Sequence, residues 1–210
     1  MKNIIIAGAG GFGKEIATLL ESAVVSENIR IGGFIDDTLQ AAPALNERYP
    51  YPVLGKITEY KPAQGDVFII AIGDPKAKLS IAESLELRGA EFFNFIHPTA
   101  IIARTAKLGK GIILCPFSVA SSDSHIADFV TINNYSGAGH DASLGKGTTV
   151  SSHVDITGYV KIGEAVFIGS NASILPGVEV GAFAKIGAGA IVVRRVKEGA
   201  TVYAAPARTL

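Results

Sequence analysis

Two short stretches of this 210-residue sequence carry residue types suited to chemistry, and the first is "NNYSGAGHDASLG". It contains a histidine, His140, followed directly by a carboxylate, Asp141. A carboxylate beside an imidazole fixes its tautomer and stabilises its protonated form, so the pair suits proton transfer. A histidine and an aspartate on a turn are also commonly just solvated. The pair alone therefore leaves its role open.

The second stretch is a glycine-rich loop within "IIIAGAGGFGKEIA". Gly8, Gly10 and Gly13 form G-x-G-x-x-G between a strand-like run and a helical pattern, where backbone N–H groups and the helix N-terminus can hold a phosphate. An acidic pair, Asp36 and Asp37, follows the next predicted strand, where a ribose or base contact would lie. A nicotinamide cofactor is the first candidate ligand. Because a dinucleotide fold needs two halves, one nucleotide diphosphate fits this half better, and a ligand-free turn is the alternative.

The residues around this loop alternate strand and helix signals over residues 1–95. Buried strands are predicted at 3–7, 29–36 and 66–73, with a last strand in "AEFFNFI". Helices are predicted at 13–23 and from Pro75, with Asp74 as N-cap and Gly89 as C-cap. This order predicts a Rossmann-like α/β domain with a small parallel sheet, whose ligands bind at the strand C-terminal ends.

A six-residue repeat replaces this pattern over residues 96–210. Every sixth residue is apolar without a break in register, and the position four residues later is small or Val except at Ile112. The 17 apolar anchors are Ile96, Ile102, Leu108, Leu114, Ala120, Ile126, Ile132, Ala138, Leu144, Val150, Ile156, Ile162, Ile168, Ile174, Val180, Ile186 and Val192. A fixed short period predicts an all-β solenoid, in which three hexads form one triangular coil of 18 residues. The glycine that often follows an anchor is expected to provide the turn's unusual dihedral angles.

The repeat also gives His140 a neighbour. His140 comes two residues after the anchor Ala138, at a corner, so its ring is expected to point outward. One coil later stands Gly158, which would leave room for a substrate and expose a backbone N–H group. A base beside an open backbone donor is the minimum set for acyl transfer.

Composition excludes several partners and sites. Nineteen basic residues balance nineteen acidic residues, so no net field attracts nucleic acid or an anionic membrane. No apolar run approaches the roughly 20 residues of a membrane span, and the single cysteine suits a reducing compartment, so a cytoplasmic protein is expected. The spacings of His97, His125, His140 and His153 put no two of them on one column of the coil, so no metal site is predicted.

The whole chain resembles the bacterial nucleotide-sugar and sialic acid acetyltransferases of the PglD/NeuD type, which are hexapeptide-repeat acyltransferases. The resemblance lies in "IIIAGAGGFGKEIA", "GGFIDD", "AIGD", "NFIHPTAII", "GHDASLG" and "GYVKIGEAVFIGSNASILPGV". It implies a left-handed parallel β-helix, a homotrimer and acetyl-CoA bound in clefts between neighbouring subunits.

The resemblance also assigns roles to single residues. It implies that His140 is the catalytic base with Asp141 as its partner, that Asn133 belongs to the site, and that the Gly158 amide meets the thioester oxygen. Nucleotide-sugar contacts map onto Gly10, Gly11, Gly13, Asp36, Asp37, Gly73 and Asp74, and the backbone that contacts acetyl-CoA maps onto Gly158, Ser170, Gly187 and Ala188. The chain departs from the pattern at Lys78, where many members carry Arg, and at Asp141, where some carry Glu.

These observations predict a nucleotide-sugar-binding domain, residues 1–95, and a β-helix acetyltransferase domain, residues 96–210. The expected reaction is acetyl-CoA-dependent N-acetylation of a nucleotide-linked amino sugar, such as a 4-amino-4,6-dideoxy sugar for surface glycans. O-acetylation of a sialic acid, a non-catalytic nucleotide-sugar-binding trimer and a zinc hydratase are the alternatives.

Overall fold

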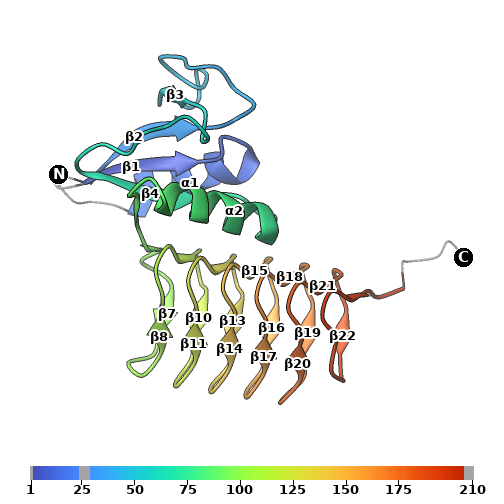
Figure 1. Ribbon diagram of the computed structural model, residues 1–210. Coiled ribbons are helices and arrows are strands. Elements are labelled where there is room, and N and C mark those ends of the chain that lie inside the picture. The colour runs from blue at the N-terminus through green and yellow to red at the C-terminus, as the bar shows by residue number, and fades with distance from the viewer. Residues whose placement is uncertain (1, 24–28, 206–210) are drawn as a thin grey trace, which may run out of the picture. The chain divides into compact units, whose positions relative to one another are not determined.

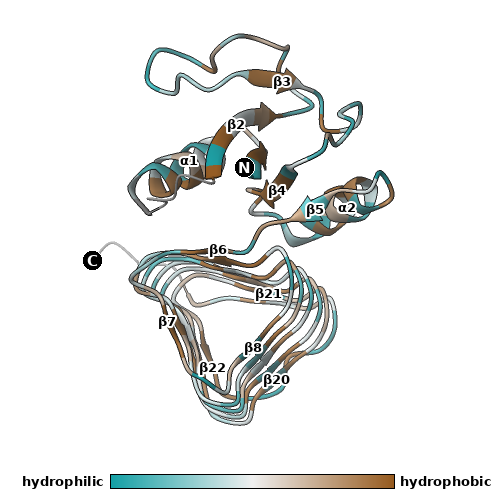
Figure 2. Ribbon diagram, turned by 90° about the vertical axis from the view of Figure 1, so that its left-hand side faces the viewer, coloured by the Kyte–Doolittle hydropathy of each residue, from teal (hydrophilic) through white to brown (hydrophobic). Residues whose placement is uncertain are grey.

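The computed structural model describes residues 2–23 and 29–205, and the chain divides into two compact units, Met1–Phe95 and Ile96–Leu210. The first unit contains a five-stranded parallel sheet, with α1 (Gly11–Ala23) on one face and α2 (Pro75–Glu86) on the other (Figures 1 and 2). The strands, in spatial order, are β3 (Val53–Gly55), β2 (Ile29–Ile35), β1 (Lys2–Ala7), β4 (Asp66–Ile70) and β5 (Glu91–Phe92). The central strands β1 and β4 are apolar and almost fully buried between the two helices, as the doubly covered parallel sheet requires.

Local signals set the ends of α2. The Asp74 carboxylate accepts a hydrogen bond from the Ala77 N–H, and Pro75 occupies the first turn, as predicted. The C-cap is Leu87 rather than the predicted Gly89. Gly89 has a φ of +81° and follows the cap in a Schellman-type turn, in which the Gly89 and Ala90 amides donate to the carbonyls of Glu86 and Leu85.

The sequence interpretation of this unit missed one strand and needs correction at another. The strand β3 had no prediction, because its three residues are too short for a periodic signal. The predicted strand "AEFFNFI" is two strands, β5 and β6 (Phe95–Ile96). The chain leaves one sheet for another between them, since β5 pairs with β4 while β6 pairs with β9 of the second unit.

A lysine is buried in α2. Lys78 is only 1% exposed, and burial lowers its pKa from 10.5 to about 7, against the Asp74 carboxylate, which raises it. A buried Lys78 does not present its amine to solvent in this structure, so the Arg-for-Lys difference noted above is a difference in the interior of the domain.

The second unit is a triangular prism of stacked coils with three parallel sheets (Figures 1 and 2). Face 1 contains β6, β9 (Ile113–Leu114), β12 (Thr131–Ile132), β15 (Thr149–Val150), β18 (Phe167–Ile168), β21 (Lys185–Ile186) and β23 (Thr201–Val202). Face 2 contains β7 (Ile101–Ile102), β10 (Val119–Ala120), β13 (Gly137–Ala138), β16 (Asp155–Ile156), β19 (Ser173–Ile174) and β22 (Ile191–Val192). Face 3 contains β8 (Lys107–Leu108), β11 (His125–Ile126), β14 (Ser143–Leu144), β17 (Lys161–Ile162) and β20 (Glu179–Val180). Corner 1 joins faces 1 and 2, corner 2 joins faces 2 and 3, and corner 3 returns the chain to face 1.

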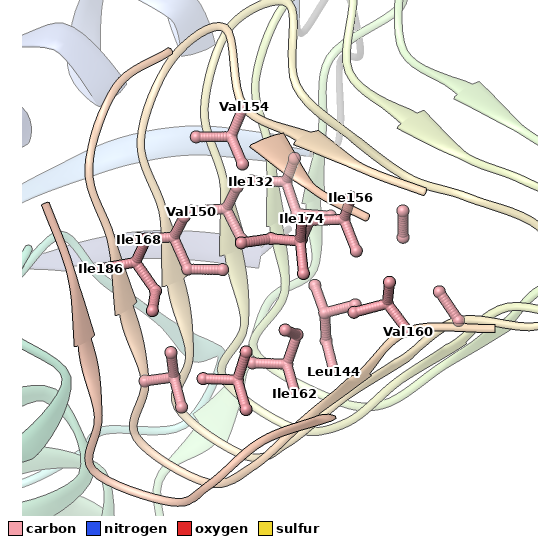
Figure 3. Packing of buried hydrophobic residues seen from close by; sticks show 14 of the residues in the cluster. Ile132, Leu144, Val150, Val154, Ile156, Val160, Ile162, Ile168, Ile174 and Ile186 are labelled. Carbon is pink, nitrogen blue, oxygen red and sulfur yellow. The ribbon is translucent and has the colours of Figure 1, made fainter. Parts of the chain in front are cut away.

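The repeat sets both the strands and the core. Each predicted anchor, from Ile96 to Val192, is the second residue of a two-residue strand. The anchors from Leu114 onward are buried and point into the prism (Figure 3), and each buried Ile, Leu or Val contributes roughly 1.5–3 kcal/mol. Ile96, Ile102 and Leu108 form the first coil, which no earlier coil covers, so Ile96 remains 38% exposed. The predicted β-solenoid is confirmed.

The reason for the glycines after the anchors is different from the one expected. Non-glycine residues with positive φ, such as Asp141 and Tyr159, stand three residues after an anchor, whereas Gly145 and Gly163 directly after anchors have no such dihedral. A Cβ at Gly145 would collide with the carbonyl carbon of Gly163 in the next coil. Close approach of successive coils, rather than a left-handed φ, therefore requires these glycines.

The last coil is shorter than the others. Position 198, where the next anchor would fall, is Glu198. Val196 bridges to Val180 instead, and β23 pairs with β21 at Val202 and Ile186, sixteen residues apart. The repeat thus continues beyond Val192 with two residues fewer. No helix in the described part of the chain is long and apolar enough to cross a membrane.

Burial of Lys78 predicts a pH-dependent stability of the first unit. Between pH 7 and pH 10.5 the unfolded chain keeps the Lys78 proton and the folded chain has lost it, so the free energy of unfolding rises with pH. We expect the melting temperature of this unit to be higher at pH 9.5 than at pH 7, and Lys78→Met to remove that increase. Calorimetry of the two proteins at the two pH values measures it. An equal pH dependence in both proteins would contradict the assignment.

Candidate active site

His140 lies on corner 2, two residues after the end of β13, with its ring turned outward. Its side chain is 58% exposed, and its Nδ1 lies 2.9 Å from Oδ2 of Asp141, whose side chain is 41% exposed. An Nδ1–H that donates to the carboxylate leaves Nε2 with its lone pair free. Asp141 can take this position because it adopts a left-handed φ of 59°, which aspartate tolerates better than most residues.

Gly158 lies one coil further along the same corner, directly beside the imidazole. A Cβ built on Gly158 would lie 2.5 Å from Nε2 and 2.6 Å from Cε1 of His140. The missing side chain is therefore the space that the ring occupies. Among the described residues none accepts a hydrogen bond from the Gly158 N–H, although its carbonyl accepts one from Gly177. The predicted pairing of base and open amide thus lies on one corner of one chain.

A third residue, which sequence reasoning missed, contacts the imidazole. The ring of Tyr159 meets that of His140 edge to face, with centroids 5.0 Å apart and planes at 89°, and the Tyr159 amide donates to the His140 carbonyl. Adding one coil of 18 residues to Asp141 would have found it. Asp141, Gly158 and Tyr159 together hold the ring with Nε2 beside an unused backbone donor, an arrangement that can accept a proton and stabilise a nearby oxyanion.

The other residues that the resemblance assigns to catalysis and to acetyl-CoA lie on a different corner. Asn133, Ser170, Gly187 and Ala188 follow anchors of face 1 and therefore line corner 1. The Asn133 side chain is held there, where its Nδ2 donates to the Val150 carbonyl and its Oδ1 lies 3.7 Å from Sγ of buried Cys115. A single chain therefore does not bring these residues to His140.

Corner 1 also carries a column of stacked rings. Phe117, Tyr135 and His153 lie parallel at centroid spacings of 5.0 Å, with planes at 12° and 9°. Beside them is a hollow of about 410 Å³ on face 2, which Gly137 and residues of the coils before and after it line. His153 is thus a stacking residue at the edge of this hollow.

The remaining histidines lie apart from His140. The His97 Nδ1 is 2.8 Å from Oγ1 of Thr99 in the first coil, and His125 is exposed on face 3. In residues 2–23 and 29–205, no three His, Cys, Asp or Glu side chains gather closely enough to hold a metal ion.

The glycine-rich loop in the first unit contains glycines of two kinds. The fold requires Gly8, with a φ of +102°, and Gly13, where a Cβ would collide with the Gly8 carbonyl as α1 packs on β1. Gly10, Gly11 and Gly73 have neither a positive φ nor any atom within 4 Å of a Cβ, so packing does not explain them. They leave the backbone open at the N-terminus of α1 and the end of β4, where an anionic ligand is favoured.

The acidic pair is largely occupied with structural bonds. Asp36 accepts hydrogen bonds from the Ala9 N–H and from the Thr38 N–H and hydroxyl. Partial burial alone would raise the pKa of Asp36, but these bonds outweigh it and hold the pKa below its usual 3.8. Asp37 accepts from the Thr58 N–H and hydroxyl through Oδ1, and among the described residues its Oδ2 has no donor. Asp37 Oδ2 is therefore better placed for a ligand than Asp36, which fixes the loop.

Two protein-family models match this chain, one in each unit. The PglD N-terminal domain family matches residues 3–85, and the bacterial transferase hexapeptide family (six repeats) matches residues 159–194. UDP-N-acetylbacillosamine N-acetyltransferase of Bacillus subtilis (strain 168) is 33% identical over 115 residues, 54% of this chain and 51% of that protein. The chain thus spans about half the length of this curated relative.

Solved structures match over the full length. WeeI from Acinetobacter baumannii AYE is 30% identical, with a TM-score of 0.85 and 100% of each chain covered. PerB from Caulobacter crescentus, solved in complex with CoA and GDP-perosamine, is 26% identical, with a TM-score of 0.83, and the match covers 99% of this chain and 97% of that one.

The fold and the site define a hexapeptide-repeat protein with an N-terminal α/β domain. The chain belongs to the family of proteins in which a PglD N-terminal domain is followed by hexapeptide repeats. Its solenoid is the left-handed parallel β-helix of that family, as the resemblance implied.

The contact between Gly158 and the imidazole predicts the effect of one added methyl group. Gly158→Ala should leave the fold intact, since the φ of Gly158 is not in the left-handed region, but should push the His140 ring away from Gly158. A crystal structure of the variant measures this displacement, and Ser122→Ala, one coil to the other side of His140, is the matched control. A ring that stays in place in Gly158→Ala would contradict the close approach.

Proposed function

We propose that this protein is an acetyl-CoA-dependent N-acetyltransferase that acts on the amine of a nucleotide-linked amino sugar. The observation that carries the proposal is the position of His140 Nε2 beside the unused Gly158 amide, with Nδ1 held by Asp141. The similarity to UDP-N-acetylbacillosamine N-acetyltransferase and to PerB, solved with CoA and GDP-perosamine, supports this donor and this class of acceptor.

His140 and Gly158 have complementary tasks in this reaction. The sugar amine attacks the thioester carbon, its proton passes to His140 Nε2, and the Gly158 N–H stabilises the oxyanion that forms. The C–S bond then breaks, and the leaving CoA thiolate takes the proton back from the imidazolium. Asp141 keeps Nδ1 protonated and stabilises the transient positive charge on the ring. The amine attacks directly, so the step uses neither a metal nor an acyl-enzyme.

The first unit is proposed to bind the nucleotide end of the acceptor. The open backbone at Gly10, Gly11 and Gly73 lets a diphosphate approach the N-terminus of α1, whose dipole favours negative charge. Gly13 and Asp74 shape the same edge by packing α1 and capping α2, and Asp36 and Asp37 follow β2 beside it. The nucleotide sugar would therefore occupy the C-terminal ends of β1, β2 and β4.

A homotrimer would complete the acyl-donor site. His140 and Gly158 line corner 2, whereas Asn133, Ser170, Gly187 and Ala188 line corner 1, so one chain contains two separated halves. A neighbouring copy that places its corner 1 against this corner 2 brings the halves together. Three prisms arranged in this way form a closed ring with three equivalent sites. We place this trimer in the cytoplasm, because a reducing compartment keeps thiols such as the free, buried Cys115 reduced.

A transfer assay tests the proposed reaction. Thiol release from acetyl-CoA is measured with UDP-, GDP- and dTDP-linked 4-amino-4,6-dideoxy sugars, and at least one is expected to be acetylated on nitrogen. His140→Ala should lower kcat by roughly 10²- to 10⁴-fold with little change in the KM for acetyl-CoA, because the base acts in the transition state.

His125→Ala is the matched control, since His125 is exposed on face 3 and should leave kcat unchanged. Acetylation of free sialic acid but of no nucleotide sugar would overturn the proposed acceptor. Full activity of His140→Ala would overturn the mechanism.

A further inference from the structure

Tyr159 has no task in the reaction described above, although its ring contacts the proposed base. The residue is 60% exposed and lies outside the buried core of the prism, so burial of an apolar side chain does not explain the contact. The coil beyond gives the ring no support, because a Cβ built on Gly177, the next residue in the same column, meets no atom within 4 Å. In the described part of the chain, the ring contact of Tyr159 is with His140.

The angle between these two rings is not the one that stacking of coils produces. Rings at the same position of successive coils lie parallel, as Phe117, Tyr135 and His153 do with planes at 12° and 9°. His140 and Tyr159 differ by one position along their corner, and their planes meet at 89° with centroids 5.0 Å apart. This edge-to-face arrangement is favourable for aromatic pairs. The two rings therefore form a specific contact rather than a stack that the register imposes.

An exposed imidazole needs more than one contact to keep a single orientation. The His140 side chain is 58% exposed, and exposed side chains change rotamer within picoseconds to nanoseconds. The hydrogen bond between Nδ1 and Asp141 fixes one ring atom but lets the plane turn about that bond. The Tyr159 ring restricts the plane itself, and the Tyr159 N–H, which donates to the His140 carbonyl, fixes the two backbones relative to each other. Together these contacts keep Nε2 beside Gly158.

We propose that Tyr159 is a positioning residue whose ring sets the plane of the His140 imidazole, an inference that rests on the proposed function. The ring carries this task rather than the hydroxyl, which forms no hydrogen bond within the described residues. An edge-to-face pair shifts an equilibrium roughly 2- to 12-fold, which is the size of the effect expected on the orientation of the base. A base that turns away lowers the rate of the chemical step and leaves binding of acetyl-CoA as it was.

Kinetics of two variants test this role. Tyr159→Leu removes the ring and should lower kcat roughly 2- to 12-fold, with the KM for acetyl-CoA unchanged. Tyr159→Phe keeps the ring and should retain the wild-type kcat. The matched control is Phe183→Leu, which removes an aromatic ring with the same left-handed φ (61°, against 60° for Tyr159) from corner 3 and should leave kcat unchanged.

Crystal structures of the same variants give a second readout that does not depend on activity. The imidazole of His140 should turn from its present plane, or adopt two orientations, in Tyr159→Leu, and should keep its orientation in Tyr159→Phe. An imidazole that keeps its orientation in Tyr159→Leu overturns the inference, whether or not the protein acetylates an amino sugar.

The kinetic outcomes separate the inference from the proposed function. A wild-type kcat in Tyr159→Leu overturns the inference, and so does a raised KM for acetyl-CoA with unchanged kcat, because Tyr159 would then contact the donor. An equal loss in Tyr159→Phe and Tyr159→Leu also overturns it, since the hydroxyl would then carry the task. Wild-type protein that acetylates no amino sugar overturns the proposed function, and the orientation of the imidazole in the crystal structures then decides the role of Tyr159.

Discussion

The pairing of each coil with the next is the interaction on which the rest of the structure depends. From β6 to β22 each strand of the prism hydrogen-bonds to the strand 18 residues away, so a position in the middle coils has a neighbour of the same kind one coil above and one below. The buried anchors keep this register, since a shift of one residue would expose the whole apolar column. The site at corner 2 is therefore a consequence of stacking: His140 and Gly158 are distant in sequence and adjacent in space.

Close stacking also decides which residues fit at each corner. Glycine directly after an anchor makes room for the backbone of the next coil, as Gly145 does for Gly163. At corner 2 the same absence of a side chain is used differently, because Gly158 makes room for an imidazole rather than for backbone. The absence of a side chain at Gly158 thus leaves room for the His140 ring and places the Gly158 amide beside it.

The hexad period made the second unit largely predictable, because one register assigns every anchor at once. It gave the position of Gly158 relative to His140 for the same reason. It gave the wrong cause for the glycines after anchors, since contact between coils is not visible in a dihedral preference. The shortened last coil was also missed, because Glu198 interrupts the six-residue repeat.

In the first unit, β3 and the division of "AEFFNFI" depend on pairing with distant strands, and short segments carry no signal of that pairing. The resemblance named Gly10, Gly11 and Gly73, and the open space around them is a feature that only coordinates reveal.

The two corners explain why the residues proposed for the site lie apart in a single chain. Corner 2 carries the proposed base and oxyanion donor, and corner 1 carries Asn133 and the residues proposed to contact acetyl-CoA. The central claim is that the acceptor amine meets His140 Nε2 while the thioester oxygen faces the Gly158 amide. A crystal structure with CoA and an accepted nucleotide amino sugar tests it most directly. The account predicts the amine nitrogen within about 2.6–3.2 Å of His140 Nε2. An amine that lies against a different side chain, with His140 facing solvent, would contradict it.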